Sequence, residues 1–212
     1  MKVLIIGAKG NLGSRIVKKA KQRGHDITAC LKDGETFEEG NALNANLFDL
    51  TQKDIKRFDA VLSAFGSGIN ADPSLNQKAC DKLIELGQNS DVHILHIIGS
   101  GSLYEDATHT GRVYEAADHP DVLRPISAWA LKGMEDFKNS HKVKWTVVCP
   151  SKTFDRDRAG TGHYEVGTDE NLLYNDSGES FTTYDDVADA MLDFAEEGSH
   201  IGQVCTILSV NV

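Results

Sequence analysis

Short apolar segments alternate with amphipathic segments along most of this chain, and this alternation strongly constrains its fold. The apolar segments lie at residues 3–6, 25–31, 59–66, 92–102, 144–150 and 202–210. Segments with helical spacing of apolar residues lie between them, at 11–23, 74–87, 127–140 and 183–198. Strands buried on both faces form such continuous apolar runs, and the intervening helices make the crossovers of a parallel sheet. The pattern therefore predicts an α/β fold with a doubly wound parallel sheet.

Three further segments complete this organisation. The stretch "ANLFDL", residues 45–50, predicts a short strand. Thr51 stands three residues before Asp54, a capping-box spacing that predicts a helical turn. Residues 153–180 are rich in glycine and charge and follow no period, and they are too long for an ordinary connection. We expect residues 1–212 to form a single domain in which 153–180 is an irregular segment on the substrate side.

Composition excludes several classes of partner. The chain has 212 residues, a formal net charge of -10 and four cysteines without a CxxC pair. A nucleic-acid-binding protein needs a basic face, so we expect no nucleic acid partner. No apolar run approaches the roughly 20 residues that span a bilayer, so we expect no membrane association and a cytoplasmic location. Separated cysteines predict buried thiols and no metal site.

A glycine-rich loop, "GAKGNLG" at residues 7–13, directly follows the first apolar segment. In this position Gly7 permits a tight turn, Gly10 lets the backbone approach a pyrophosphate, and Gly13 allows close packing of helix on strand. The N-terminus of the following helix would direct free N–H groups toward phosphates. The alternative is a strand-to-helix turn that binds nothing.

Small residues end several of the predicted strands. They are Gly7, Gly66, Gly99 with Ser100, and Pro150 with Ser151. Because the carboxyl ends of parallel strands meet at one edge of the sheet, we expect these residues to border a single ligand cleft. The alternative is that such loops simply favour glycine.

The end of the second strand bears on the choice of nicotinamide cofactor. A basic residue there favours the 2′-phosphate of NADP, and an acidic residue there favours the free ribose 2′-hydroxyl of NAD. Lys32 comes first after the apolar run and Asp33 follows it. We therefore expect NADP, with NAD left open.

The chain resembles the atypical short-chain dehydrogenase/reductases, in particular the NADH-flavin reductase group, with NmrA-like and biliverdin reductase B-like proteins as wider relatives. The resemblance rests on "MKVLIIGAKGNLG", "DAVLSAFGSG", "HIIGSGSLYED", "VKWTVVCPS", "GTGHYEVG" and "SFTTYDDVADAMLDFAE", which together extend over nearly the whole chain. It implies a Rossmann-type domain with a small C-terminal substrate lobe, an NAD(P)H cofactor, and reduction of a flavin or similar acceptor.

The resemblance also implies site residues. Those assigned to the pyrophosphate loop are Gly7, Lys9, Gly10, Asn11, Leu12 and Gly13. Those assigned to the adenosine half are Leu31, Lys32, Asp33, Asn46 and Leu47, where Asn46 replaces a common aspartate. Those assigned to the ribose and nicotinamide are Phe65, Gly66, Ser67, Ser100, Pro150 and Ser151, with Ser100 a weak catalytic candidate. Lys152 stands where a relative has a histidine on the substrate side.

One catalytic pair is missing. None of the five tyrosines is followed four residues later by lysine, so the YxxxK pair that protonates a carbonyl oxygen in ordinary short-chain dehydrogenases is absent. Hydride transfer to a flavin or quinone needs mainly stacked rings. Tyr104, in a loop past Ser100, is the aromatic residue expected to line the substrate cleft.

Two functions remain open at this point. One is an NAD(P)H-dependent reductase whose partner is a small-molecule electron acceptor, with flavin as substrate and not as a tightly bound group. The other is a non-catalytic NADP(H)-binding redox sensor of the NmrA type. Either protein is expected to be a monomer or a homodimer.

Overall fold

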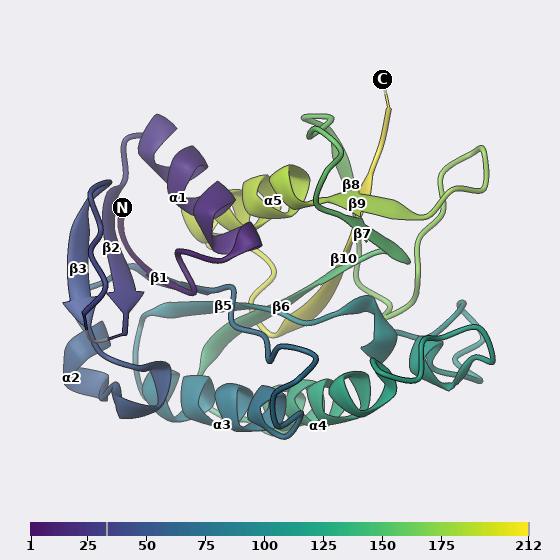
Figure 1. Ribbon diagram of the computed structural model, residues 1–212, viewed down its shortest axis with the longest axis horizontal. Coiled ribbons are helices and arrows are strands. Elements are labelled where there is room, and N and C mark those ends of the chain that lie inside the picture. The colour runs from purple at the N-terminus through teal and green to yellow at the C-terminus, as the bar shows by residue number, and fades with distance from the viewer. Residues whose placement is uncertain (33, 212) are drawn as a thin grey trace.

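The computed structural model describes residues 1–32 and 34–211. Over these residues, eight strands form one sheet in the order β3-β2-β1-β4-β5-β6-β10-β8 (Figure 1). Every pairing in this sheet is parallel except that of β8 with β10. The predicted doubly wound α/β fold is confirmed. The sheet strands are β1 (Lys2–Ile6), β2 (Asp26–Leu31), β3 (Asn41–Asn44), β4 (Ala60–Ser63), β5 (His93–Ile97), β6 (Lys144–Pro150), β8 (Tyr164–Gly167) and β10 (Gln203–Ser209).

Helices cover both faces of the sheet. The α-helices are α1 (Asn11–Gln22), α2 (Gln52–Ile55), α3 (Leu75–Gly87), α4 (Arg124–Asn139) and α5 (Tyr184–Glu197). Short 3₁₀ helices are η1 (Leu47–Asp49), η2 (Ser100–Ser102) and η3 (Val113–Glu115). In Figure 1, α1 and α5 lie above the sheet and α2, α3 and α4 below it. No helix of the described part of the chain has the length and apolar character required to cross a membrane.

The alternation of side chains along β1 explains why its sequence is apolar from Val3 to Ile6. Val3 and Ile5 pack in the core cluster that also contains residues of α1 and α5. Leu4 and Ile6 pack in the cluster on the opposite face, with residues of α3 and α4. Because successive side chains of a strand point to opposite faces, a strand covered on both sides has no polar position.

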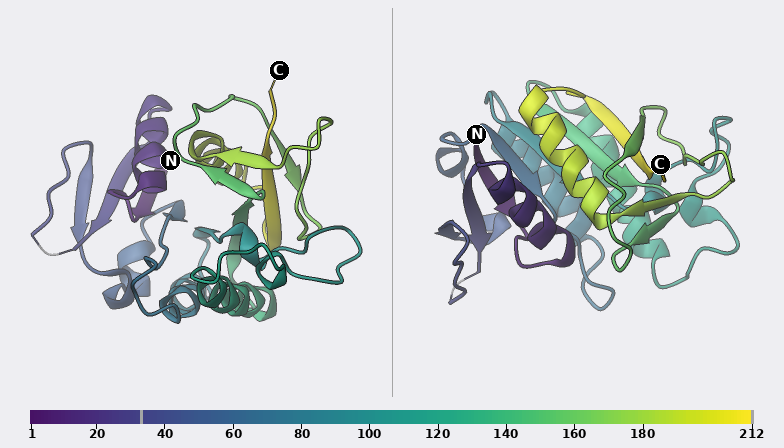
Figure 2. Two further views of the ribbon diagram at one scale, coloured as in Figure 1. Left: turned by 45° about the vertical axis from the view of Figure 1, so that its right-hand side comes forward. Right: turned by 90° about the horizontal axis from the view of Figure 1, so that it is seen from above.

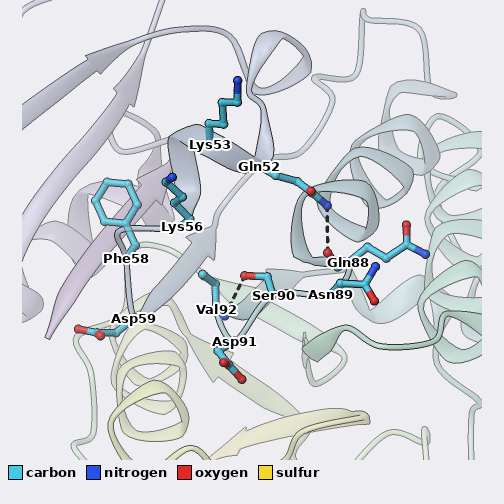
Figure 3. Close-up of a pocket in the computed structure, with 10 residues that line it drawn as sticks. All are labelled: Gln52, Lys53, Lys56, Phe58, Asp59, Gln88, Asn89, Ser90, Asp91 and Val92. Atoms are coloured by element: carbon cyan, nitrogen blue, oxygen red, sulfur yellow. Dashed lines mark hydrogen bonds between the residues drawn. The ribbon is translucent and has the colours of Figure 1, made fainter.

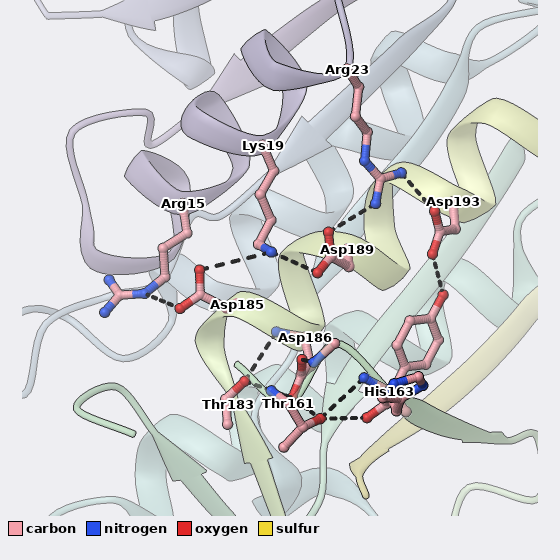
Figure 4. Close-up of polar contacts among 12 residues, drawn as sticks. Arg15, Lys19, Arg23, Thr161, His163, Thr183, Asp185, Asp186, Asp189 and Asp193 are labelled. Carbon is pink, nitrogen blue, oxygen red and sulfur yellow. Dashed lines mark hydrogen bonds and ion pairs between the residues drawn. The ribbon is translucent and has the colours of Figure 1, made fainter. Parts of the chain in front are cut away.

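Basic residues of α1 pair with aspartates of α5 along the length of both helices (Figure 4). The pairs are Arg15 with Asp185, Lys19 with Asp189, and Arg23 with Asp189 and Asp193. Their N···O distances are 3.6, 2.6, 2.8 and 2.6 Å in that order. Residues four apart share one helix face, so the two rows meet as the helices lie side by side (Figure 2). The helix that starts at the glycine-rich loop is thereby joined to α5.

The predicted strand at residues 45–50 is wrong. This segment contains η1, and the strand that pairs with β2 is β3, which lies just before it. The side chain of Asn46 accepts a hydrogen bond from the backbone N–H of Phe48 at 3.2 Å and begins η1. An asparagine that bonds to its local backbone favours such a turn over a strand. The predicted capping box is present, since Asp54 accepts from the backbone N–H of Thr51 at 2.8 Å.

Residues 153–180 contribute strands to two sheets. The segment contains β7 (Thr153–Asp155), which pairs with β9 (Phe181–Thr183), and β8, which extends the main sheet. The buried carboxylate of Asp186 attaches this segment to α5 by accepting from the backbone N–H groups of Thr161 and Gly162. Burial alone would raise the pKa of Asp186, but hydrogen bonds from Ser209 and Thr183 help to hold it below its ordinary value.

Candidate functional site

Two pockets adjoin at the carboxyl ends of the central strands. The first, the glycine-loop pocket, has a volume of about 330 Å³. The second, the central pocket, has a volume of about 550 Å³, within the range usual for small-molecule sites. Ala64, Phe65 and Gly66, which follow β4, line both pockets. A single elongated ligand can therefore extend from one pocket into the other.

The glycine-rich loop has the geometry of a phosphate cradle. Gly7 has a φ of +78°, and a Cβ there would lie 3.0 Å from the carbonyl oxygen of Ala64. The turn is closed by a 2.9 Å hydrogen bond from the N–H of Gly10 to the carbonyl of Gly7. Helix α1 begins after Gly10 with no side-chain cap and no acidic residue in its first turn. Its first N–H groups and partial positive charge therefore suit an anion.

The glycine-loop pocket is bordered by the end of β2. Leu31 is buried there, Lys32 is exposed, and both line the pocket together with Lys9. The backbone N–H of Lys32 donates to the carboxylate of Glu35 at 3.1 Å. Asn46 and Leu47 also line this pocket. Asp33 lies outside the described residues.

The central pocket has mostly apolar walls. Its larger apolar side chains come from the ends of strands and from helices on both faces of the sheet: Leu12, Phe65, Ile69, Ile97, Ile98, Ile126, Phe154 and Tyr184. The rings of Phe154 and Tyr184 lie 3.8 Å apart between centroids. Among the described residues that line this pocket, none is lysine, arginine, aspartate or glutamate. Such walls suit a flat aromatic ring.

The polar side chains in the lining of the central pocket are those of Asn11, Ser67, Asn76, His96 and Tyr184. The amide of Asn76 is committed to the neighbouring loop, since it accepts from the N–H of Ser67 at 3.0 Å and donates to its Oγ at 2.7 Å. His96 lines the pocket, and its Nδ1 lies 3.0 Å from Oγ of Ser63. Burial lowers the pKa of His96 to about 4, so the imidazole is neutral near pH 7.

The structure brings most of the expected residues together. Those that line one or both pockets are Gly7, Lys9, Gly10, Asn11, Leu12, Leu31, Lys32, Asn46, Leu47, Phe65, Gly66, Ser67 and Gly99. Gly13 lies beneath the loop, where a Cβ would be 2.0 Å from the carbonyl oxygen of Gly7. It therefore permits the close approach of helix and loop.

Other expected residues are not part of the described pocket linings. They are Ser100, Tyr104, Pro150, Ser151 and Lys152. The ring of Tyr104 stacks on His109 at 4.2 Å between centroids and packs against the guanidinium of Arg112 at 3.5 Å. The ammonium of Lys152 pairs with Asp118 at 3.3 Å. Ser151 is buried, and its Oγ has no hydrogen-bond partner within the described structure.

A further pocket, of about 660 Å³, lies at the opposite edge of the sheet (Figure 3). It is lined by residues that precede β4 and β5, including Asp59 and Val92, and by residues around α2. Its volume exceeds that of the central pocket. However, ligands of doubly wound sheets bind at the carboxyl ends of the strands, so this hollow is the weaker candidate.

Comparison with known proteins identifies the family. Residues 7–198 match the NAD(P)H-binding family. The chain belongs to this family. It is 34% identical over 212 residues to the uncharacterized protein YwnB of Bacillus subtilis (strain 168), with 99% of each chain covered. The expected relationship to the atypical short-chain dehydrogenase/reductases is confirmed.

Solved structures of the same fold extend this comparison. SP1627 of Streptococcus pneumoniae TIGR4, described as "a putative NADH-flavin reductase", is 31% identical, with a TM-score of 0.91 and coverage of 99% of this chain and 100% of that one. ChuY of Escherichia coli O157:H7, an anaerobillin reductase, is 13% identical, with a TM-score of 0.77 and coverage of 100% and 98%. At that identity the likeness shows the shared fold alone.

The cleft of this NAD(P)H-binding protein fits a dinucleotide. The open backbone at Gly10 and the uncapped start of α1 suit a pyrophosphate, and the pockets on either side of Phe65 suit two ring systems. Sequence reasoning did not assign the residues that α3, α4, β7 and α5 contribute, namely Asn76, Cys80, Ile126, Ala130, Phe154 and Tyr184. The motif containing Tyr184 was part of the family resemblance and was the only available signal for that residue.

Proposed function

We propose that this protein is an NAD(P)H-dependent reductase that transfers a hydride to a flavin, a quinone or a similar ring acceptor. The observation that carries the proposal is the apolar central pocket, which shares Ala64, Phe65 and Gly66 with the glycine-loop pocket. A dinucleotide held by the loop would place its nicotinamide in the central pocket, beside the acceptor. The similarity to SP1627, which is named as an NADH-flavin reductase, supports the same class of reaction.

The protein's part in this reaction is to bind and align the two rings. When bound, the reduced nicotinamide supplies the hydride, and the acceptor then takes a proton from solvent. The described pocket offers no strong acid: burial raises the pKa of Tyr184, and His96 is neutral. An acceptor that delocalises charge over its ring tolerates this arrangement, whereas a simple ketone requires a proton at oxygen.

The finer features of the proposal rest on particular residues. NADP is favoured over NAD because Lys9 and Lys32 both line the glycine-loop pocket and could pair with a 2′-phosphate. Flavin is a substrate and not a resident group. Cys30, Cys80, Cys149 and Cys205 are all free and buried, which supports a cytoplasmic location. The oligomeric state that we propose is a monomer or a homodimer.

Steady-state oxidation of NADPH and NADH against a panel of flavins and quinones tests this function. We expect measurable turnover with ring acceptors and none with simple secondary alcohols or ketones. Cofactor binding measured by calorimetry serves as the control for an intact site. Binding of NADPH without turnover of any acceptor would contradict the proposal and favour the non-catalytic redox sensor.

A further inference from the structure

The central pocket differs from its surroundings in charge. The protein has a formal net charge of -10 and is 25% charged residues, yet none of the described side chains lining this pocket carries a full charge. Its single imidazole, His96, stays neutral because burial lowers its pKa to about 4. A charged ligand would therefore meet no countercharge on the walls.

Two cations outside the lining, Arg15 and Arg156, act on the ring of Tyr184, and both pair with carboxylates. Arg15 lies beside the ring of Tyr184, with 5.4 Å between its guanidinium carbon and the ring centroid. Its guanidinium donates to the carbonyl oxygens of Asn11 and Arg156 at 2.9 and 2.6 Å and pairs with Asp185 at 3.6 Å. This guanidinium is thus bonded to the backbone of Asn11, which belongs to the pocket lining, and to Arg156 and Asp185, which do not.

An exposed isoleucine contributes to the same pocket. Ile69 lines the central pocket although its side chain is 62% exposed. Val122, which is 59% exposed, does not belong to the described lining. An apolar side chain exposed at the pocket gains from contact with an apolar ligand, so Ile69 favours the same ligand chemistry as the buried part of the lining.

We propose that the central pocket selects uncharged ring acceptors, of the quinone class, and disfavours acceptors whose ring carries an anionic group. This inference rests on the proposed function and specifies its substrate. Moving an anion from water to apolar walls without a partner is strongly unfavourable. A cofactor bound at the glycine-rich loop would add the negative charge of its pyrophosphate nearby and increase the discrimination.

Two matched pairs of compounds test the proposal. For turnover, the pair is 2-methyl-1,4-naphthoquinone, which is uncharged, and 1,4-naphthoquinone-2-sulfonate, which carries a negative charge on a substituent of the ring. For binding, the pair is 2-naphthamide and 2-naphthoate, which accept no hydride and are nearly equal in shape, titrated by calorimetry into the NADPH-bound protein, whose reduced nicotinamide is uncharged. We expect the uncharged member to be favoured by about tenfold or more in both kcat/KM and affinity.

A charge introduced at the pocket provides the second measurement. Ile69→Lys should reduce the preference for the uncharged compound by about threefold, because the ammonium attracts the anion across solvent. Val122→Lys adds the same charge to an equally exposed apolar position outside the lining and should leave the ratio unchanged.

The outcomes separate this inference from the proposed function. Binding of 2-naphthoate as tight as or tighter than that of 2-naphthamide by the parent protein would overturn the charge selection while leaving a reductase. An equal effect of the two lysine variants would also overturn it, because the selection would then reflect the charge of the whole molecule. Preference for 2-naphthamide without turnover of either quinone would support the charge selection and contradict the reductase.

Discussion

Gly10 and Gly13 are equivalent in the sequence motif but not in the structure. A Cβ on Gly10 would meet only the carbonyl oxygen of Gly7, at 3.2 Å. A Cβ on Gly13 would lie 2.0 Å from the same atom, a distance that requires the backbone to move. The space above Gly10 is therefore available to a ligand, whereas the space at Gly13 is occupied by the protein itself.

We expect Gly10→Val to weaken binding of both NADPH and NADH with little loss of stability. The branched side chain would occupy the space of the pyrophosphate, while the extended backbone at this position, φ -77° and ψ 172°, accepts valine. Calorimetric affinities and the midpoint of thermal unfolding measure the two effects. Gly13→Val should instead lower the unfolding midpoint. A Gly10→Val protein that binds both cofactors as tightly as the parent would show that the loop is not a phosphate cradle.

Lys32 is the second residue with a specific expected effect. Lys32→Ala should weaken the binding of NADPH by about tenfold or more and leave the binding of NADH nearly unchanged. The reason is that a charge-assisted contact to a phosphate contributes roughly 1.5–3 kcal/mol, and NADH has no 2′-phosphate. Lys53→Ala, at the pocket on the opposite sheet edge, is the matched control for loss of one positive charge. Dissociation constants of all three proteins for both cofactors provide the measurement. Equal losses for NADPH and NADH would refute the assignment of Lys32 to the 2′-phosphate.

At the scale of elements, β5 carries two buried histidines, and this predicts a dependence of stability on pH. Burial lowers the pKa values of His93 and His96 to about 4 in the folded protein, below the ordinary value of 6.5. Between these values the unfolded chain binds protons that the folded chain does not. The free energy of unfolding should therefore be highest above about pH 6.5 with respect to these two groups. It should fall toward pH 4 by up to about 1.4 kcal/mol per pH unit for each histidine.

Urea unfolding at pH 7, 6 and 5 measures this slope. His96→Gln removes one of the two groups and should make the decline distinctly shallower. Any loss of stability that His96→Gln shows at pH 7 does not affect this test, because the test compares how the free energy of unfolding changes with pH in the variant and in the parent. An unchanged slope in this variant would mean that His96 is already protonated in the folded protein or does not contribute.

The elements that the sequence predicted correctly are those with a strong apolar pattern. The buried central strands and the long helices have one. Strand β3 does not, since only Leu43 of its four residues is partly buried and the others are exposed. The apolar residues of the adjacent segment 45–50 instead anchor η1 and the start of α2: Leu47 and Leu50 are buried in one core cluster. An edge strand that contributes few side chains to the core has no apolar pattern by which its sequence could predict it.

At the scale of the whole molecule, the sequence revealed one side of the cleft and not the other. Residues such as Gly10 and Phe65 follow predicted strands directly, so topology alone brings them to the carboxyl edge. Residues such as Ile126 and Tyr184 reach the pocket only because α4 and α5 pack at particular angles, which no local pattern specifies. Tyr104 illustrates the converse, because its contacts with His109 and Arg112 hold it within its own loop.

The segment Ala64–Gly66, common to both pockets, would also couple the binding of their two occupants if either of them orders it. A cofactor that orders this segment lowers the entropic cost for an acceptor that contacts it next. Linkage makes this effect mutual. If the bound cofactor raises the affinity for an inert ring compound by some factor, the bound ring compound raises the affinity for the cofactor by the same factor. The wall between the pockets is thus also the element through which a full acceptor site could slow the departure of spent cofactor.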